Sequence, residues 1–339
     1  MSIDILKDDI KNKRIKNLYL FYGPEEYLKK YYLESLEKEI LSDDMKALNK
    51  IVLEGKADIK RISEACETMP VFSERKIVIV RNSGLLKAKK KQDDEGKGKQ
   101  GDDSLVSYLQ NLPEYTCLVF FEEEIDKRVK VIDIIKKNGL IVEFVFQKPV
   151  ELVKWVSKVF KTYKKEIDPV LASRMVENCE QGMTEILNEI NKVVLYLGDR
   201  QRVTNDDIEK ICTKSIKGRI FDLTDAIAEK NTAKALKLLN DMIILKEPIP
   251  KILFMITRQL RQVLEMKLLN NEGLNSGQAA TKMGITPYAA GKISKQTRVF
   301  DVENLKGAIE ESLDMDLAIK TGKIDERMAV ELLISKLSK

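Results

Sequence analysis

The sequence predicts a mixed protein, with an α/β part built on a parallel sheet followed by an all-helical part. Five short apolar segments in the first 146 residues alternate with segments whose apolar residues have helical spacing. This alternation is typical of a parallel sheet with helices on both faces. After Pro149 the strand-like segments largely stop, and helical periodicity continues to the end of the chain. With 339 residues the chain is also long enough for two or three domains.

The predicted strands are apolar and bounded by turns or helical segments. Residues 17–22 (NLYLFY) precede a Gly-Pro turn. Residues 76–80 (KIVIV) are continuous and β-branched, as in a strand that is covered on both faces. The other strands are predicted at residues 49–53, 116–121 and 140–146, and helices between them at residues 25–41, 58–68, 104–112 and 129–137.

The remaining chain is predicted to form two helical domains. Apolar stripes indicate helices at residues 152–163 and 186–197, and Thr204 with Asp207 indicates the capped start of a third. Further stripes continue from residue 220 to residue 337. We therefore predict an α/β domain at residues 1–147, a three-helix lid domain at residues 148–213 and a larger C-terminal helical domain at residues 214–339.

A lysine-rich segment, residues 87–103 (KAKKKQDDEGKGKQGDD), interrupts the α/β domain. It has no aliphatic residue beyond Ala88, so it cannot bury a face, and we expect a mobile loop. A basic clamp on DNA is the alternative, but the acidic residues among the lysines favour a solvated loop.

The composition excludes several classes of protein. Histidine is absent and the four cysteines are scattered without a C-x-x-C pair, which argues against zinc sites and against Ser-His or Cys-His catalysis. We expect buried structural thiols, no catalytic residues and no bound metal. There is no apolar run of transmembrane length, so a cytoplasmic protein is expected. The net charge of +5 permits contact with DNA but does not require it.

An α/β domain followed by a helical lid is the arrangement of AAA+ ATPases, so the turn after the first strand is the place for a phosphate-binding loop. That loop needs G-x-x-x-x-G-K-[ST]. Here Gly23 and Lys29 coincide with the pattern, but Leu28 replaces the second glycine and Lys30 replaces the hydroxyl residue. Pro24 and two glutamates in the turn also disfavour a bound phosphate.

The acidic pair that would hold magnesium at the end of the third strand is missing as well. Arg81 and Asn82 follow residues 76–80, where carboxylates are needed. Two independent losses favour an AAA+-like domain without a functional phosphate loop, and we expect no nucleotide or other cofactor. An unrelated α/β fold that never bound nucleotide is equally compatible with these residues.

The chain resembles the delta subunits of bacterial DNA polymerase III. The resemblance is carried by segments whose order and spacing match that family over nearly the full length, apart from the lysine-rich segment. These segments are residues 18–26 (LYLFYGPEE), 76–80, 182–194 (GMTEILNEINKVV), 220–228 (IFDLTDAIA), 246–250 (KEPIP), 258–261 (RQLR), 280–300 (ATKMGITPYAAGKISKQTRVF) and 316–320 (DLAIK).

The resemblance implies a clamp-loader subunit that binds and opens the beta sliding clamp for loading onto primed DNA. It implies an AAA+-like domain, a lid and a C-terminal collar that assembles with gamma/tau and delta-prime subunits. It implies no catalysis by this chain, so that the nucleotidyltransferase activity of DNA-directed DNA polymerase (class 2.7.7.7) belongs only to the whole complex. Lysines or arginines facing DNA are a weaker expectation that we do not assign to positions.

The resemblance also implies a clamp-binding element at Met69, Pro70, Val71 and Phe72, where Val71 is shorter than the family's usual leucine. Independently, Pro70 biases Met69 away from helical dihedrals, so the preceding helix should end near it. Met69 and Phe72 lie outside the apolar stripe of that helix, as anchors for a partner's pocket would. From the residues alone, a loop fastened to its own core by Val71 and Phe72 is the simpler interpretation.

Two other functions remain alternatives. Residues 280–290 have the pattern of a helix-turn-helix of a transcription regulator, with Gly284 in the turn and Lys292 and Lys295 available to phosphates. No Arg, Asn or Gln lies early on the second helix to contact bases, which favours packing in a helical bundle. An active AAA+ ATPase with a degenerate loop is the other alternative.

Overall fold

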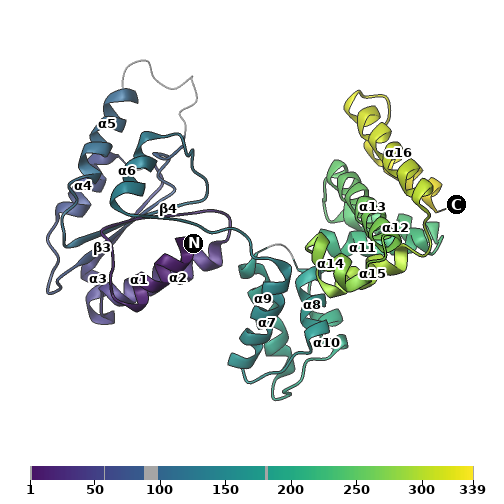
Figure 1. Cartoon of the computed structure of the whole chain (residues 1–339), viewed down its shortest axis with the longest axis horizontal. Coiled ribbons are helices and arrows are strands. Elements are labelled where there is room, and N and C mark those ends of the chain that lie inside the picture. The colour runs from purple at the N-terminus through teal and green to yellow at the C-terminus, as the bar shows by residue number, and fades with distance from the viewer. Residues whose placement is uncertain (1, 57, 88–97, 180–181, 339) are drawn as a thin grey trace. The chain divides into compact units, whose positions relative to one another are not determined.

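The computed structural model describes residues 2–56, 58–87, 98–179 and 182–338. The chain divides into two compact units, Met1–Phe146 and Gln147–Lys339 (Figure 1). The first unit is α/β and the second is helical, as predicted.

The first unit is built on a five-stranded parallel sheet with the order β2-β3-β4-β1-β5. Its strands are β1 (Leu18–Tyr22), β2 (Lys50–Glu54), β3 (Lys76–Arg81), β4 (Thr116–Glu122) and β5 (Leu140–Glu143). Because β1 lies between β4 and β5, the turn that follows β1 is at the switch point of the sheet, on the carboxyl edge. Open α/β sheets bind their ligands at this position. The fold therefore places the sequence around Gly23 where a phosphate loop would be.

Helices cover both faces of the sheet (Figure 1). They are α1 (Ser2–Lys11), α2 (Glu26–Ile40), the 3₁₀ turn η1 (Asp43–Met45), α3 (Lys46–Asn49), α4 (Ile59–Glu67), α5 (Gly98–Leu109) and α6 (Lys130–Asn138). Alternate strand residues point to opposite faces. Leu20 and Phe120 pack with α4, α5 and α6, whereas Phe21 and Val119 pack with α1 and α2. Both faces are thus buried, which explains the continuous apolar strands.

The first unit departs from the prediction in four places. The short elements η1 and α3 were not predicted, and Asn49, predicted as the first residue of the second strand, is the last residue of α3. Helix α1 was not predicted, because its charged residues obscure an apolar face on which Leu6 is fully buried between Ile3 and Ile10. Helix α5 begins at Gly98, so the last residues of the segment predicted as a mobile loop are helical. Once the apolar residues from position 104 onward have formed a helix, adding residues to its start costs little free energy. Residues 88–97 of that segment lie outside the described residues. Strand β5 ends at Glu143, three residues earlier than predicted.

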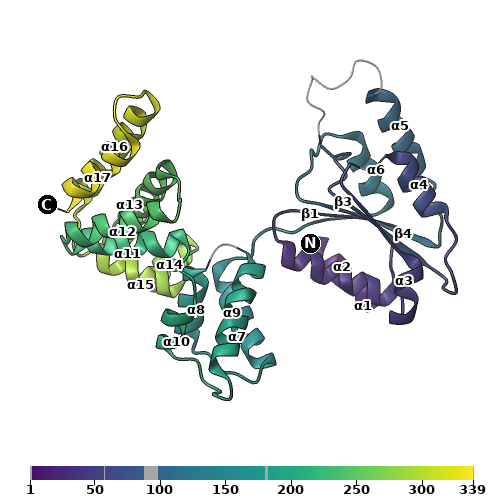
Figure 2. The same ribbon diagram turned by 180° about the vertical axis from the view of Figure 1, so that it is seen from behind.

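The second unit consists of helices (Figure 2). They are α7 (Pro149–Thr162), α8 (Pro169–Asn178), α9 (Met183–Leu197), α10 (Asn205–Ile211), α11 (Ile216–Ala228), α12 (Thr232–Ile244), α13 (Ile249–Asn271), α14 (Ser276–Met283), α15 (Pro287–Gln296), α16 (Val302–Lys320) and α17 (Glu326–Leu337). The lid segment therefore contains four described helices, and the prediction of three was incomplete. Helix α8 was not predicted. Its start is nevertheless marked in the sequence, since the Asp168 carboxylate accepts a hydrogen bond from the Val170 N–H and Pro169 occupies the first turn.

The lid helices are hydrogen-bonded to the helices that follow them. The Asn178 carbonyl accepts from the Ser215 N–H at 2.7 Å, and the Thr286 hydroxyl donates to the Glu177 carboxylate at 2.7 Å. Glu177 also forms an ion pair with Lys217. The two predicted helical domains lie within one compact unit, and the boundary at residue 213 stays a prediction.

The four cysteines are free and buried, which confirms the interpretation of them as structural thiols. Burial raises the pKa of Cys66, Cys117 and Cys212 to about 12, so these thiols are held in the unreactive protonated form. Within the described ranges, no helix combines the length and apolar character that crossing a membrane requires.

Candidate functional site

The loop at residues 68–72, here called the exposed loop, follows the end of α4. Helix α4 ends at Glu67, near the position that Pro70 predicted. The side chains of Met69 and Phe72 are 71% and 89% exposed, and Val71 is 41% exposed. The interpretation in which Phe72 fastens this loop to its own core is therefore wrong. Two large apolar side chains, Met69 and Phe72, instead project into solvent from the same short loop.

The base of the exposed loop is held firmly. The last carbonyls of a helix have no partner within it, and at the end of α4 three successive carbonyls are satisfied by side chains. Cys66 O accepts from the Thr116 hydroxyl at 2.7 Å, Glu67 O from the Tyr115 hydroxyl at 2.9 Å, and Thr68 O from the Lys76 ammonium at 2.5 Å. The exposed loop therefore projects from a fixed helix end.

Two further side chains hold the rest of the segment. Asn49, 2% exposed, makes two hydrogen bonds to the backbone of Val71. The Arg75 guanidinium donates to Ile15 O at 2.9 Å and to the Asn17 side chain at 2.7 Å. None of these supporting residues was identified from the sequence, because their pairing appears only in the fold.

The turn after β1 is occupied by contacts within the protein. Gly23 has φ +116° and lies so close to Phe144 that a Cβ would be 2.4 Å from the Phe144 oxygen. Its N–H donates to Glu123 O at 3.1 Å, and the Glu25 N–H donates to Phe144 O at 3.0 Å. Pro24 has no N–H. These backbone donors are therefore not available to a phosphate.

Lys29, which coincides with the lysine of a phosphate loop, is 2% exposed. Its ammonium donates to Glu122 O at 3.1 Å, lies 3.1 Å from the Glu26 carboxylate and sits 4.8 Å from the centre of the Phe121 ring. Its charge is thus already neutralised by the protein. Leu28 packs against the core, and Lys30 is exposed and paired with Glu26.

The end of β3, where an acidic pair would hold magnesium, carries Arg81 and Asn82 and no carboxylate. The Arg81 guanidinium lies 5.0 Å from the Phe121 ring, on the same ring as Lys29, and the Asn82 N–H donates to Phe121 O. Glu122, at the end of β4, was not identified from the sequence. Its carboxylate is buried and accepts from the Ser83 N–H at 2.9 Å and the Ser83 hydroxyl at 2.6 Å. Burial raises the pKa of Glu122, and the bonds from Ser83 oppose that rise.

We expect no measurable binding of ATP with magnesium to the isolated chain. The backbone donors and the ammonium that would hold the phosphates are engaged, and Glu25 and Glu26 place negative charge in the turn. Isothermal titration calorimetry is the measurement. A dissociation constant of about 0.1 mM or tighter would contradict this account, and a Lys29→Met variant tests whether any such heat arises at this turn.

The segment with the helix-turn-helix pattern forms α14, a left-handed turn at Gly284 and α15, as its sequence predicted. Ala289 and Ala290 of the second helix are buried, and the Tyr288 N–H donates to the Ser173 hydroxyl of α8. The ammonium of Lys292 is paired with Asp222 and Asp225. This helix is therefore engaged by the bundle rather than presented as a recognition helix.

Comparisons with known proteins agree over nearly the whole chain. The family model described as "DNA polymerase III, delta subunit" matches residues 19–145, and that of the "DNA polymerase III delta subunit, C-terminal domain" matches residues 217–337. The DNA polymerase III subunit delta of Bacillus subtilis is 28% identical over 342 aligned residues, covering 100% of this chain and 97% of that protein. A probable DNA polymerase III subunit delta of Aquifex aeolicus is 20% identical, covering 87% of this chain and 83% of that protein.

A solved structure shows the same similarity. The Bacillus subtilis DNA clamp loader delta protein is 27% identical, with a TM-score of 0.51, and the match covers 100% of this chain and 99% of that one. The matches include both the turn after β1 and the exposed loop of the first unit.

Proposed function

Because the chain belongs to the family of DNA polymerase III delta subunits and is a clamp-loader component, we propose that it binds the beta sliding clamp and opens it for loading onto primed DNA. Family membership removes the two unrelated alternatives, an α/β fold outside this family and a helix-turn-helix regulator.

The observation that carries the proposal is the exposure of Met69 and Phe72 on a firmly held base. Full burial of such a side chain stabilises a complex by about 1.5–3 kcal/mol. An aromatic ring beside a flexible thioether also suits a partner's apolar pocket. A segment that is fixed in the free protein loses little conformational entropy on binding. The exposed loop therefore has the properties of a compact docking element.

Clamp opening follows from differential binding. A ligand with equal affinity for the closed and open clamp would leave their populations unchanged. The delta chain must therefore bind the open shape better, so that its binding free energy stabilises the opened interface. In this proposal the exposed loop supplies the contact with the clamp, and the α/β unit that carries the loop moves as a rigid body.

ATP binding is left to sister subunits. The turn after β1 is filled by contacts within the protein, so we propose that this chain is a non-catalytic member of the loader. The gamma/tau and delta-prime subunits are the proposed partners, with primed DNA contacted through the assembled complex. A cytoplasmic location follows from this role in replication.

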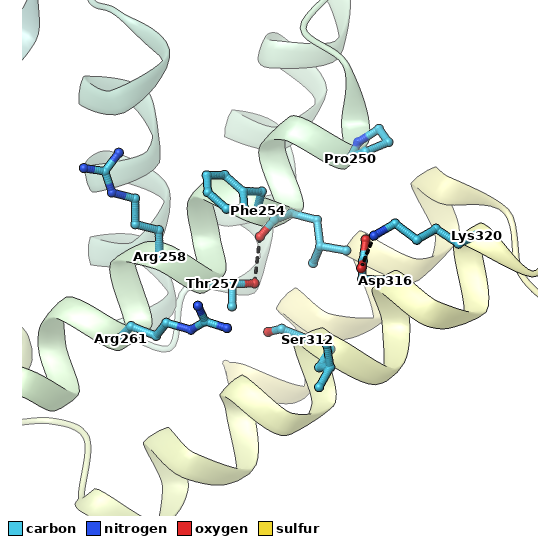
Figure 3. A pocket seen from close by; sticks show the side chains of 10 residues that line it. Pro250, Phe254, Thr257, Arg258, Arg261, Ser312, Asp316 and Lys320 are labelled. Carbon is cyan, nitrogen blue, oxygen red and sulfur yellow. Dashed lines mark hydrogen bonds and ion pairs between the residues drawn. The ribbon is translucent and has the colours of Figure 1, made fainter. Parts of the chain in front are cut away.

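A groove on the second unit suits a sister subunit (Figure 3). It lies between α13 and α16, with a volume of about 370 Å³. Phe254 and Leu313, each 62% exposed, supply apolar surface. Arg258 and Arg261 project from α13, and neither has an acidic partner among the residues that the structure describes (Figure 3). We propose that this groove receives a helix of a neighbouring loader subunit that presents an apolar side chain and a carboxylate.

Arg261→Glu is expected to weaken assembly with gamma/tau and delta-prime by about tenfold, because the new carboxylate at position 261 would repel the carboxylate that the partner helix presents to the groove. Lys237→Glu makes the same change of charge on α12, at an exposed lysine outside the groove, and is expected to leave assembly within about twofold. Native mass spectrometry of the reconstituted loader measures both. Equal effects of the two variants would contradict the assignment of this groove.

The function is tested by capturing purified clamp with this chain alone. Specific capture is expected without ATP, because the exposed loop needs no nucleotide to be presented. Failure of the isolated chain to capture the clamp, while the assembled loader captures it, would place the clamp contact on another subunit.

A further inference from the structure

Asn49 lies at the end of α3, directly before β2, with its side chain 2% exposed. Its carboxamide oxygen accepts from the Val71 N–H at 2.7 Å, and its amide nitrogen donates to Val71 O at 2.8 Å. The same nitrogen lies 3.2 Å from Met45 O, within its own segment. One buried side chain therefore forms hydrogen bonds with both the backbone N–H and the backbone carbonyl of Val71, a residue 22 positions away.

The segment that Asn49 holds has little other support. In the described part of the chain, residues 69–75 make no backbone–backbone hydrogen bonds, whereas the residues on either side of them do. The bonds to Thr68 O and from Arg75 lie at the two ends of this segment. Between those ends, the pair of bonds from Asn49 is what joins the backbone to the body of the unit.

The residue after Val71 has an unfavourable backbone conformation. Phe72 has φ +52°, in the left-handed region that L side chains rarely adopt. Its ring is 89% exposed, so packing of the ring cannot be what maintains this conformation. Strained backbone persists only where its surroundings fix it. The fixed neighbour is Val71, whose peptide groups are held by Asn49.

We infer that Asn49 is the positioning residue of the exposed loop, setting the direction in which Phe72 is presented to the clamp. The inference rests on the proposed function. Without Asn49 the residues around Phe72 would sample several conformations, and apparent affinity falls by the fraction of molecules that are competent to bind. Asn49 thus contributes to clamp affinity without touching the clamp.

The test is the affinity of Asn49→Ala for the clamp, measured by surface plasmon resonance. The control is a variant that lowers the stability of the same unit without touching the exposed loop. Asn49→Ala is expected to weaken binding about tenfold, corresponding to a competent fraction of about one-tenth. Ile135→Val trims a fully buried residue of α6, far in sequence from the loop and from Asn49. It destabilises the same unit, and clamp affinity is expected to stay within about twofold of wild type.

Hydrogen exchange separates positioning from a general structural role. In Asn49→Ala the amide of Val71 is expected to exchange at least about tenfold faster, while the amides of β3 keep their protection. Faster exchange throughout β2 and β3, equal to that at Val71, would overturn the inference in favour of a structural role. This readout does not depend on the clamp.

Failure of the inference is distinguishable from failure of the proposed function. If Met69→Ala with Phe72→Ala abolishes clamp binding while Asn49→Ala binds like wild type, Asn49 is not a positioning residue and the docking role of the loop stands. If the double substitution leaves affinity unchanged, the proposed function of the exposed loop fails, and with it the role of Asn49.

Discussion

Replacing Met69 and Phe72 together by alanine is expected to lower affinity for the sliding clamp by two orders of magnitude or more. Each side chain contributes about 1.5–3 kcal/mol if it is fully buried in the complex, and a factor of ten corresponds to about 1.4 kcal/mol. Both residues are strongly exposed in the free chain, so their removal leaves no cavity and should leave stability almost unchanged. Surface plasmon resonance on immobilised clamp measures the loss.

A matched control removes exposed apolar surface elsewhere. Val170 and Leu195 are 65% and 81% exposed on α8 and α9. Val170→Ala with Leu195→Ala should leave clamp affinity unchanged, and both double variants should assemble with the other loader subunits like wild type. A clamp affinity that survives the loss of Met69 and Phe72 would contradict the docking role of the exposed loop.

Glu177→Ala is expected to give the largest loss of stability among the substitutions considered. Glu177 is 2% exposed and joins α8 to two later helices, through the Thr286 hydroxyl and the Lys217 ammonium. Removing it leaves the buried hydroxyl without its acceptor and the lysine without its counter-charge. Removing one partner of a fully buried pair costs about 3–5 kcal/mol. The Lys217 side chain is 40% exposed, so solvent screening reduces the expected loss to about 1–3 kcal/mol.

The single tryptophan of the chain, Trp155, lies in α7 of the second unit, so its fluorescence during urea unfolding reports that unit. Glu177→Gln is the matched control. It keeps an oxygen for Thr286 and loses only the charge, so about 1 kcal/mol or less is expected. Equal midpoints for wild type and Glu177→Ala would show that this network does not stabilise the second unit.

Much of the fold could be predicted from the sequence because its strongest signals are local. The β-branched strand at residues 76–80 and the helical stripe of α4 depend on neighbouring residues, and both were predicted within a few positions. Helix α1 was missed because only its narrow apolar face is buried. Helix α8 was missed because its start is marked by a cap rather than by a long apolar stripe.

The candidate site likewise has features that the sequence indicated and features that only the folded structure shows. The residues alone favoured a loop fastened to its own core by Val71 and Phe72, and an exposed element was expected only from the family resemblance; the structure shows Met69 and Phe72 strongly exposed. Asn49 and Tyr115 could not be predicted, since each acts across the fold on a backbone group of a distant residue. Glu122 was missed because the sequence does not indicate that Ser83 would meet it. The local sequence thus indicated where the preceding helix ends, whereas the exposure of Phe72 and the contacts that hold the loop depend on the tertiary structure.

Hydrogen exchange of the chain with and without the clamp tests the central claim most directly. Residues 69–75 make no backbone–backbone hydrogen bonds in the described structure, so most of their amides should exchange quickly in the free chain. On adding clamp, this segment should show the largest gain in protection of the first unit. Unchanged exchange at residues 69–75, with protection appearing on another surface while the clamp is bound, would show that the exposed loop is not the contact.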